Sequence, residues 1–309
     1  MNEGLRNRLI LKLKFVHLGS SLLHVGSGKA EGELLKVVRV RSSEGKQLFI
    51  IPSHSIKGVL RRVSELIAKS TSIEKEGLEY SLIRAHCELE GEGVRHICSD
   101  DEDLKTINDY INGILSNESL ARKYIPPDSL DSIREAFESE GIKGTAELEP
   151  IVAHKCPLCN LYGGPGLGGK ILVNDIVLEG ASTFIISRTS IERASGKVRE
   201  GALFTVEALN IPEFIITLIV ENITPGSIES LILAGTLKWL TNIGVSFGGM
   251  KSVGMGHYVL SSSESRGVLI NYNEETGNVE EFLERLVNPL RYVDEGVNIE
   301  EIIEVLMAR

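Results

Sequence analysis

The cysteines of this sequence carry its clearest chemical pattern. Cys156 and Cys159, in "AHKCPLCNLYGG", have the C-x₂-C spacing that lets two thiolates reach one tetrahedral Zn²⁺, with Zn–S bonds of roughly 2.3 Å. Two coordination positions then remain, and the other two cysteines lie in "RAHCELEGEGVRHICSD". We therefore expect a zinc site made of Cys87, Cys98, Cys156 and Cys159, with a histidine replacing one upstream cysteine as the next choice: His86, His96 or His154.

Other interpretations of the cysteines remain open. A single C-x-x-C also occurs as a redox pair or as two buried thiols, and it is the second cysteine cluster that favours zinc. The sequence contains no H-E-x-x-H pattern, which catalytic zinc sites of that class require. The zinc is therefore expected to be structural.

A second group of residues, the glycine loop (residues 246–257), has glycines around one cation. It is not a P-loop, because Met250 stands where that motif needs lysine, and it is not a dinucleotide fingerprint, because a strand follows it instead of a helix. Successive amides beside a lysine can form an anion-binding nest, whereas a helix C-cap accounts for only one or two glycines. The residues concerned are Gly248, Gly249, Lys251, Gly254 and Gly256.

Hydrophobic periodicity predicts the elements that position these groups. A strand is expected at 7–18, helices at 56–70 and 227–243, and strands at 169–180, 213–223 and 257–260. Residues 184–209 indicate a long hairpin with its tip near 194–197, and the first glycine motif (residues 22–32) is expected to be a loop. The last fifty residues predict a strand and two acidic helices.

Charge is segregated along the 309 residues, whose formal net charge is −10. Residues 1–75 hold 14 Lys or Arg against 6 acidic residues, whereas residues 76–150 hold 7 against 18. A polyanionic ligand is therefore compatible with the acidic total, because binding depends on the local patch. No apolar run approaches the roughly 20 residues of a membrane span, and no signal peptide is recognisable, so a cytoplasmic protein without membrane contact is expected.

Five motifs in order resemble the RAMP superfamily, and in particular the repeated backbone subunits of type III CRISPR effector complexes. The resemblance extends from about residue 22 to 258 and is interrupted by the polar helical insertion. Its most specific part is the hairpin, with an R-x-x-G and an L-F-x-x-E piece. The motifs are "LLHVGSG", "IIPSHSIKGVLRR", "CPLCNLYGGPGLGGKI", "SRTSIERASGKVREGALFTVEAL" and "GVSFGGMKSVGMGHY".

The resemblance implies an α+β fold: a ferredoxin-like (RRM-like) core with a helical zinc-containing lid and a long β-hairpin thumb. The expected organisation is residues 1–71 as the first part of the core, 72–160 as the lid and zinc insertion, 161–262 as the second part of the core with the thumb at 186–209, and 263–309 as an acidic C-terminal region. Family members stack with other type III effector subunits into a helical filament around the CRISPR RNA, and their thumbs wedge into the duplex of guide and target RNA.

Carried over to this sequence, the resemblance implies guide-phosphate contacts and a thumb tip. Ser55, Lys57 and Arg61 would hold the guide backbone together with Lys251 and the loop amides, and the tip would carry an apolar wedge beside cations: Ile191, Arg193 and Lys197. The family's P-G-S-S reads Pro52-Ser53-His54-Ser55 here, a mild departure that keeps Ser55 and Lys57. A packing arm is the other interpretation of the hairpin.

A more serious departure concerns catalysis. RNA-cutting relatives carry an Asp after the first glycine motif, at a position that falls on or near Leu34 or Leu35. Glu31 and Glu33 are close but longer and out of register, and in-line attack tolerates misplacement poorly. We therefore expect a scaffold that binds RNA without cutting it. An active endoribonuclease that uses Glu31 or Glu33 is the alternative, and an unrelated zinc-containing enzyme is the third hypothesis.

Overall fold

The computed structural model describes residues 4–19, 22–31, 34–70, 77–85, 101–164, 166–272 and 278–308, and its main sheet is built around one long strand. That strand, β1 (Asn7–His17), pairs with β11 (Glu213–Glu221) along one edge. Along its other edge it pairs first with β14 (Arg266–Asn271) and then with β13 (His257–Leu260). The sheet is completed by short strands at its margins: β7 (Ile171–Val173), β12 (Val245–Ser246) and β15 (Val297–Asn298).

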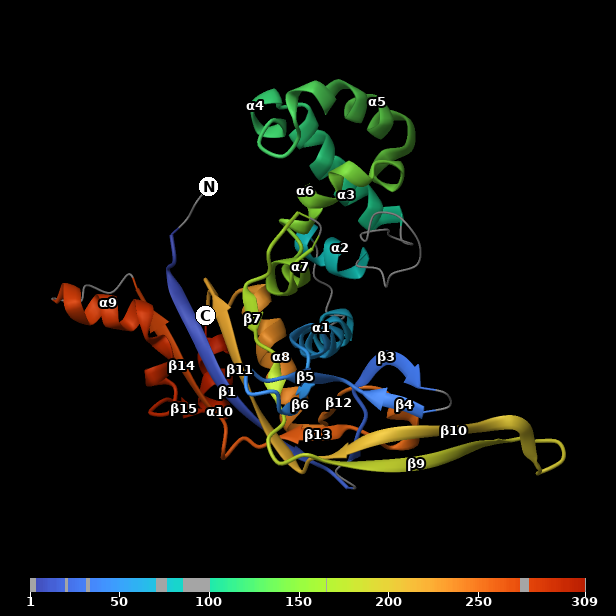
Figure 1. Cartoon of the computed structure of the whole chain (residues 1–309). Helices are drawn as coiled ribbons and strands as arrows, with labels where there is room; N and C mark the ends of the chain where they lie inside the picture. Colours follow the sequence, from blue (N-terminus) through green and yellow to red (C-terminus); the bar gives the residue numbers. More distant parts are fainter. Residues whose placement is uncertain are drawn as a thin grey trace.

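The order of these strands is ferredoxin-like. Across the sheet the order is β13, β1, β11 and β7, every neighbouring pair is antiparallel, and helices follow the first and third strands along the chain. These helices are α1 (Ser53–Ser70) and α8 (Ile228–Asn242), which lie on the same side of the sheet in Figure 1. The prediction of a mixed α+β fold is confirmed.

The core forms between this sheet and its helices because the strands alternate. Alternate residues of β1 and β11 are buried, while α1 buries one apolar face and α8 is apolar nearly all round, since it also packs against α1 and against α10 (Ile299–Met307). The residues of the two strands that are buried in this main core are Leu9, Leu11, Leu13, Phe15, Phe214, Ile216, Leu218 and Val220.

The predicted C-terminal strand and two helices are β14, α9 (Val279–Val287) and α10. While α10 joins the main core, α9 and the short helix η5 (Pro289–Tyr292) lie on the opposite side of the sheet. A small second cluster packs there around Ile10 of β1: Ile270, Tyr272 and Val293.

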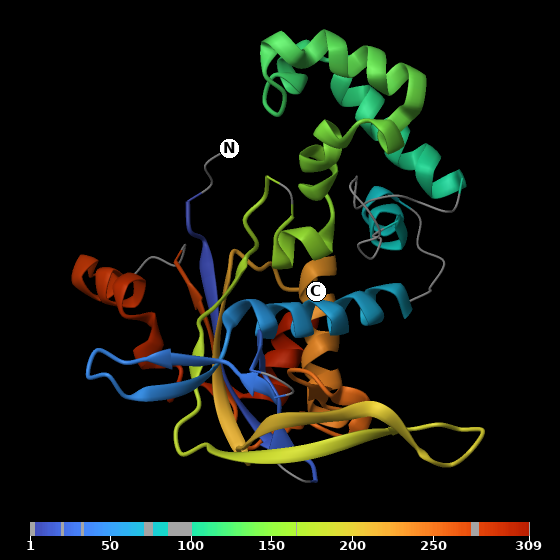
Figure 2. The same ribbon diagram turned by 45° about the vertical axis from the view of Figure 1, so that its right-hand side comes forward.

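A second sheet carries the predicted hairpin, which we call the thumb (residues 182–210). Its strands β9 (Ser182–Ile191) and β10 (Val198–Asn210) pair along their length and project from the core in Figure 2. At its base β10 also pairs with β2 (Leu22–Leu23) and, in parallel, with β4 (Leu34–Val37). The prediction of a loop for the first glycine motif is wrong: β2 and β3 (Gly26–Glu31) occupy most of it, because β3 gains a partner in β4.

A third sheet lies beside α1, and a group of helices interrupts the core after it. The sheet joins β5 (Arg39–Arg41), β6 (Gln47–Ile51) and β8 (Ile176–Val177). The helices stand away from the main sheet in Figure 2 and connect α1 to β7. They are α2 (Leu78–Ala85), α3 (Asp101–Leu115), α4 (Glu118–Ala121), η1 (Pro127–Ser129), α5 (Leu130–Glu140), η2 (Gly141–Gly144), η3 (Ala146–Leu148), α6 (Glu149–Ala153) and α7 (Pro157–Tyr162).

The insertion is helical, as its sequence indicates, and its role as a lid stays a prediction. Among the residues that the structure describes, no helix is both long and apolar enough to cross a bilayer.

Candidate nucleic-acid interface

The first predicted phosphate contacts lie on α1, where they have protein partners. Asp175 Oδ1 accepts a hydrogen bond from the N–H of Ser53 at 2.7 Å and so caps the helix, and Ser55 lies half-buried in its first turn. Lys57 Nζ donates to the carbonyl of Ile171 at 3.0 Å. Burial lowers the pKa of Lys57, and the neighbouring charge of Arg61 acts in the same direction. The Lys57 ammonium therefore contacts the chain at the start of β7.

Arg61 is held still more firmly. Its Nη1 donates to the carbonyl of Gly163 at 2.9 Å, and its Nε donates to Glu65 Oε1 at 3.0 Å, one helical turn further on. Both side chains of this ion pair are mostly buried, at 19% and 15% exposed. Lys57 and Arg61 thus converge on the segment 163–171, which leads from the helical insertion back to the sheet.

The glycine loop meets the first glycine motif through backbone contacts. The N–H of Gly249 donates to the carbonyl of His24 at 2.7 Å, and the N–H of Gly256 donates to the carbonyl of Leu22 at 2.8 Å. A Cβ at Gly248 would lie 2.2 Å from the His24 carbonyl oxygen, and one at Gly256 would lie 2.2 Å from the carbonyl oxygen of Phe247. These glycines are required because two backbone segments touch, which the anion-nest interpretation did not include.

The exposed part of the loop is a single turn between these contacts. Met250 has a left-handed backbone (φ 58°) and precedes the short helix η4 (Lys251–Val253), and Gly254 (φ 85°) follows it. Lys251 is exposed, and a Cβ at Gly254 would meet no atom within 4 Å. The Lys251 side chain is exposed on this turn, whereas the N–H groups of Val253, Gly254 and Met255 donate to carbonyls within the turn. The predicted phosphate contact would therefore rest on the Lys251 ammonium.

Every residue of the predicted thumb tip, from 191 to 198, is exposed. Ile191 and Val198 face each other as the last pair of the hairpin and are 63% and 59% exposed. The turn between them is closed by the N–H of Glu192, which donates to the carbonyl of Lys197 at 2.9 Å, and Gly196 supplies the positive φ of 68°. An apolar pair therefore stands at the tip of the hairpin with Arg193 and Lys197 beside it.

The root of the thumb holds a buried network that the sequence analysis missed as a site. Glu207, 7% exposed, pairs with Arg39 and accepts a hydrogen bond from the N–H of Val37 at its Oε2, at 3.1 Å. Its own carbonyl accepts a hydrogen bond from Nδ1 of the buried His24 at 2.7 Å. Glu207 is the last residue of the L-F-x-x-E piece, so the motif was recognised but its role was not. Through His24 the network also adjoins the glycine loop.

Of the two candidate catalytic glutamates, the structure describes the backbone of Glu31. Glu31 ends β3, where its backbone pairs with Leu34, and Glu33 lies outside the described residues. Leu34 and Leu35, where the family's aspartate would fall, begin β4 and pair with Thr205 and Val206 of the thumb root. Apolar residues therefore occupy the strand that borders the thumb.

The structure describes only some of the residues of the predicted zinc site. Cys156 precedes α7 and Cys159 lies within it; both are buried, and neither forms a disulfide bond. Burial raises the pKa of the Cys156 thiol, and its hydrogen bond to Cys159 acts in the same direction, so a thiolate there needs a compensating cation. Outside the described residues lie the other candidates: Cys87, Cys98, His86 and His96.

The described cysteines fit half of a zinc site. His154 is exposed, with its ring 5.6 Å from that of Tyr124, and within the described ranges no three His, Cys, Asp or Glu side chains gather as metal ligands. Cys156 and Cys159 would supply two sulfur ligands of the predicted type, and the other predicted cysteine ligands, Cys87 and Cys98, lie outside the described residues.

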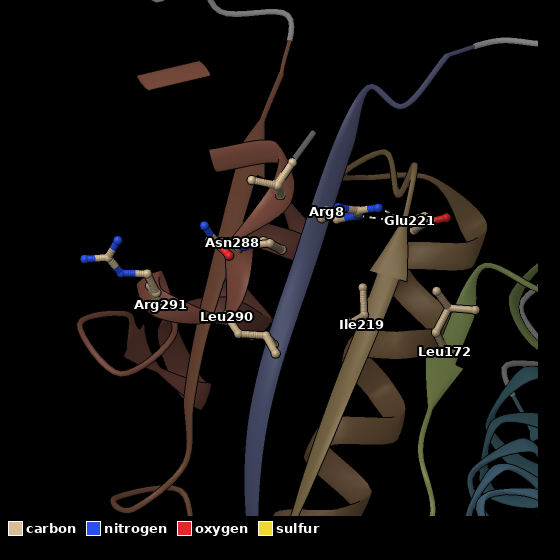
Figure 3. A pocket seen from close by; sticks show the side chains of 9 residues that line it. Arg8, Leu172, Ile219, Glu221, Asn288, Leu290 and Arg291 are labelled. Carbon is tan, nitrogen blue, oxygen red and sulfur yellow. Dashed lines mark hydrogen bonds and ion pairs between the residues drawn. The ribbon is translucent and has the colours of Figure 1, made fainter. Parts of the chain in front are cut away.

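The open face of the main sheet is poorly suited to stacking RNA bases. RRM domains stack bases on aromatic residues of their central strands, but Phe15 and Phe214 of β1 and β11 point to the buried side. A groove of about 330 Å³ crosses the open face between β1, β11 and the α9–η5 segment (Figure 3). Arg8 and Glu221 form an ion pair at 2.9 Å there, beside the apolar Ile219 and Leu290. RNA contacts are therefore expected elsewhere, on the thumb and the glycine-loop turn.

Comparison with known proteins agrees with this arrangement. The model of the RAMP superfamily matches residues 19–259, a range that runs from the first glycine motif through the thumb to β13. No curated protein matches the chain. The matched range covers well over half of the 309 residues, so the chain belongs to the RAMP superfamily and is a CRISPR-associated RNA-binding protein.

Proposed function

We propose that this protein is a backbone subunit of a type III CRISPR ribonucleoprotein, which binds CRISPR RNA and positions target RNA without cutting it. The observation that carries the proposal is the thumb: two long strands whose tip residues, 191–198, are all exposed. The exposed Ile191–Val198 pair lies beside cations, and apolar side chains between cations suit insertion into a base stack. The thumb is therefore the part assigned to the duplex of guide and target RNA.

The guide backbone is assigned to the cations of the core. Lys251 is exposed in the glycine-loop turn, and a cation held over phosphates binds all sequences alike, which leaves specificity to base pairing. Lys57 has three N–H donors, of which the Ile171 carbonyl accepts one, so a phosphate contact at Lys57 is compatible with its structural role. Ser55 and Arg61 complete this proposed contact set.

The absence of cutting rests on the residues of β4. Catalysis of in-line attack by a ribose hydroxyl needs a short acidic side chain held at one place, and Leu34 and Leu35 offer none. A filament of such subunits with other type III effector proteins would then contribute binding and geometry, while any chemistry would reside in its partners.

The first test is to purify the tagged protein from its native cells and to sequence the bound RNA. We expect short guide RNAs and type III partner subunits, with the RNA lost at high salt. In guide-loaded complexes, Ile191→Ala with Val198→Ala should weaken target binding about tenfold, whereas the matched change Val40→Ala, at a valine that is 39% exposed on β5, should not. Purified protein without RNA but with a bound metabolite would contradict the proposal.

The second test concerns cutting. A labelled target RNA is bound to a complex in which this subunit is the sole natural backbone member and its paralogues carry Asp→Ala. We expect no cleavage at regular intervals. Cleavage that persists there and disappears with Glu33→Ala would establish the endoribonuclease alternative.

A structural zinc at Cys156 and Cys159 is also part of the proposal. Zinc would supply the positive charge that two buried thiolates need and would tie α7 to the 86–100 segment. We expect about one zinc per chain by metal analysis, and a chelator should lower the melting temperature of the natural protein but not of Cys156→Ser. Protein purified without zinc, or a chelator without effect on the natural protein, would rule the site out.

A further inference from the structure

The thumb is attached to the rest of the molecule over a short length of β10. Within the described residues, β4 pairs with Thr205 and Val206, and β2 pairs with Leu209 and Asn210. Beyond Leu203 the two thumb strands pair only with each other, and their register shifts between Val198 and Leu203. Residues 205–210 thus connect the hairpin to two neighbouring strands, β4 and β2.

Glu207 lies in the middle of this attachment and contacts β4, β5 and the first glycine motif. Its Oε2 accepts from the N–H of Val37 at 3.1 Å, at the end of β4, and its Oε1 pairs with Arg39 of β5. A carbonyl oxygen can only accept, so the 2.7 Å contact between His24 Nδ1 and the Glu207 carbonyl places the proton of His24 on Nδ1. Side chain and backbone of one residue thus fix β10 against β4, β5 and the first glycine motif.

The Glu207–Arg39 ion pair is expected to add little to the stability of the fold. The side chains of Glu207 and Arg39 are 9% and 25% exposed, and at this depth the cost of removing charges from water offsets most of their attraction. A pair of apolar residues would hold the strands together about as well. What the carboxylate adds is direction, because each of its oxygens has one partner at a fixed place.

The direction of the thumb matters because the hairpin is long, so that a small rotation at its root displaces its tip by a large distance. The seven residue steps from Thr205 to Val198 span roughly 23 Å at the usual rise of a strand, so a rotation of about 10° at the root moves the tip by roughly 4 Å, more than the 3.4 Å spacing of stacked bases. We propose that Glu207 is a positioning residue, which through Arg39, Val37 and His24 sets the direction of the thumb and hence where its tip meets RNA. The contact of the tip with RNA rests on the proposed function, whereas the effect of Glu207 on the direction of the thumb does not.

The experiment measures thumb direction without RNA. Spin labels carried on unnatural amino acids at Ala194, in the tip, and at Lys69, exposed at the end of α1, report the distance distribution between thumb and core. We expect a narrow distribution in the natural protein and one at least about twofold broader in Glu207→Gln, which keeps the shape but loses the charge pair. The control is Glu44→Gln, an exposed glutamate in the turn between β5 and β6, which should leave the distribution unchanged.

A second variant keeps the test decisive if Glu207→Gln does not fold. Arg39→Lys retains the charge but loses the planar guanidinium group. The distance distribution between thumb and core should therefore broaden again while the core stays folded. An unchanged, narrow distribution in a folded Glu207→Gln or Arg39→Lys protein would overturn the inference.

Measurements of RNA binding separate the positioning role of Glu207 from the proposed function. In guide-loaded complexes, Arg39→Lys should weaken target binding about tenfold while guide retention changes less than about twofold. If the distance distribution broadens but the natural protein binds no RNA, the proposed function fails and the role of Glu207 in thumb direction stands. If target binding weakens while the distribution stays narrow, the positioning role fails and the RNA function stands.

Discussion

The first helix and the glycine loop were assigned to the same guide phosphates, yet their residues have opposite roles in the fold. On α1 the cations are engaged: Arg61 holds Gly163, and Lys57 holds Ile171. In the glycine loop the glycines are engaged, because Gly248 and Gly256 let two backbones touch, and the cation Lys251 is exposed. On α1 the basic residues at the expected spacing thus stabilise the fold, whereas in the glycine loop the glycines do so and the basic residue is exposed. The sequence pattern does not distinguish these two arrangements, but the contacts do.

The largest expected effect is at Gly256. Gly256→Ala places a Cβ 2.2 Å from the Phe247 carbonyl oxygen at a φ of 75°, and strain and overpacking together should lower the free energy of unfolding by about 3 kcal/mol or more. Gly254→Ala is the matched control, because its φ is 85° but its Cβ would meet no atom within 4 Å; it should cost about 1 kcal/mol. Urea denaturation measures both. Equal losses would mean that close approach is not what these glycines provide.

The next effect is at Arg61. Arg61→Ala removes two charge-assisted hydrogen bonds and leaves Glu65 without this partner, so the free energy of unfolding should fall by about 2 kcal/mol. Lys69→Ala, at the exposed end of the same helix, is the control and should change it by less than about 0.5 kcal/mol. If Arg61→Ala weakened RNA binding without lowering the free energy of unfolding, Arg61 would contact RNA without stabilising the fold, and the contrast between the two regions would disappear.

The elements on which this comparison rests were largely predictable from sequence. The period-two pattern of β1 and the helical periods of α1 and α8 are local, and they were read correctly because burial of one face dictates them. The strand β3 was missed since "GSGKAE" has no strand pattern of its own and forms one only through its distant pairing with β4.

The site was less predictable than the fold. Residue types and spacing predicted Lys57, Arg61 and the glycines as phosphate contacts. Their partners in the structure, at 163–171 and at His24, come from segments far away in sequence. Glu207 carried no pattern beyond its family motif, because its role depends on the meeting of β10 with β4 and β5. The long-range pairing of strands supplies information that periodicity does not contain.

A smaller effect is expected at Lys57. Its folded pKa is lowered by burial, so the folded state disfavours the charged amine, and stability is gained as the pH rises through the folded pKa towards the unfolded value of 10.5. Lys57→Met removes this dependence, and at neutral pH it should change the free energy of unfolding by less than about 1 kcal/mol, because the lost hydrogen bond and the relieved desolvation oppose each other. Denaturation between pH 7 and pH 10 checks the sign. A natural protein that loses stability relative to Lys57→Met over this range would contradict the burial argument.

The smallest effect on the fold, and the most informative for function, is at Lys251. Its side chain is exposed on the turn of η4, so Lys251→Ala should leave the free energy of unfolding unchanged. If it contacts a guide phosphate, RNA affinity should fall about equally for all sequences, and the slope of log K against log salt should decrease by roughly one. Lys57→Ala should lower the slope less, because its ammonium is shared with the Ile171 carbonyl and its charge is partly buried. Equal slopes would show that a cation held by a backbone carbonyl serves phosphates as well as a free one does, and the division between a structural helix and a binding loop would have to be abandoned.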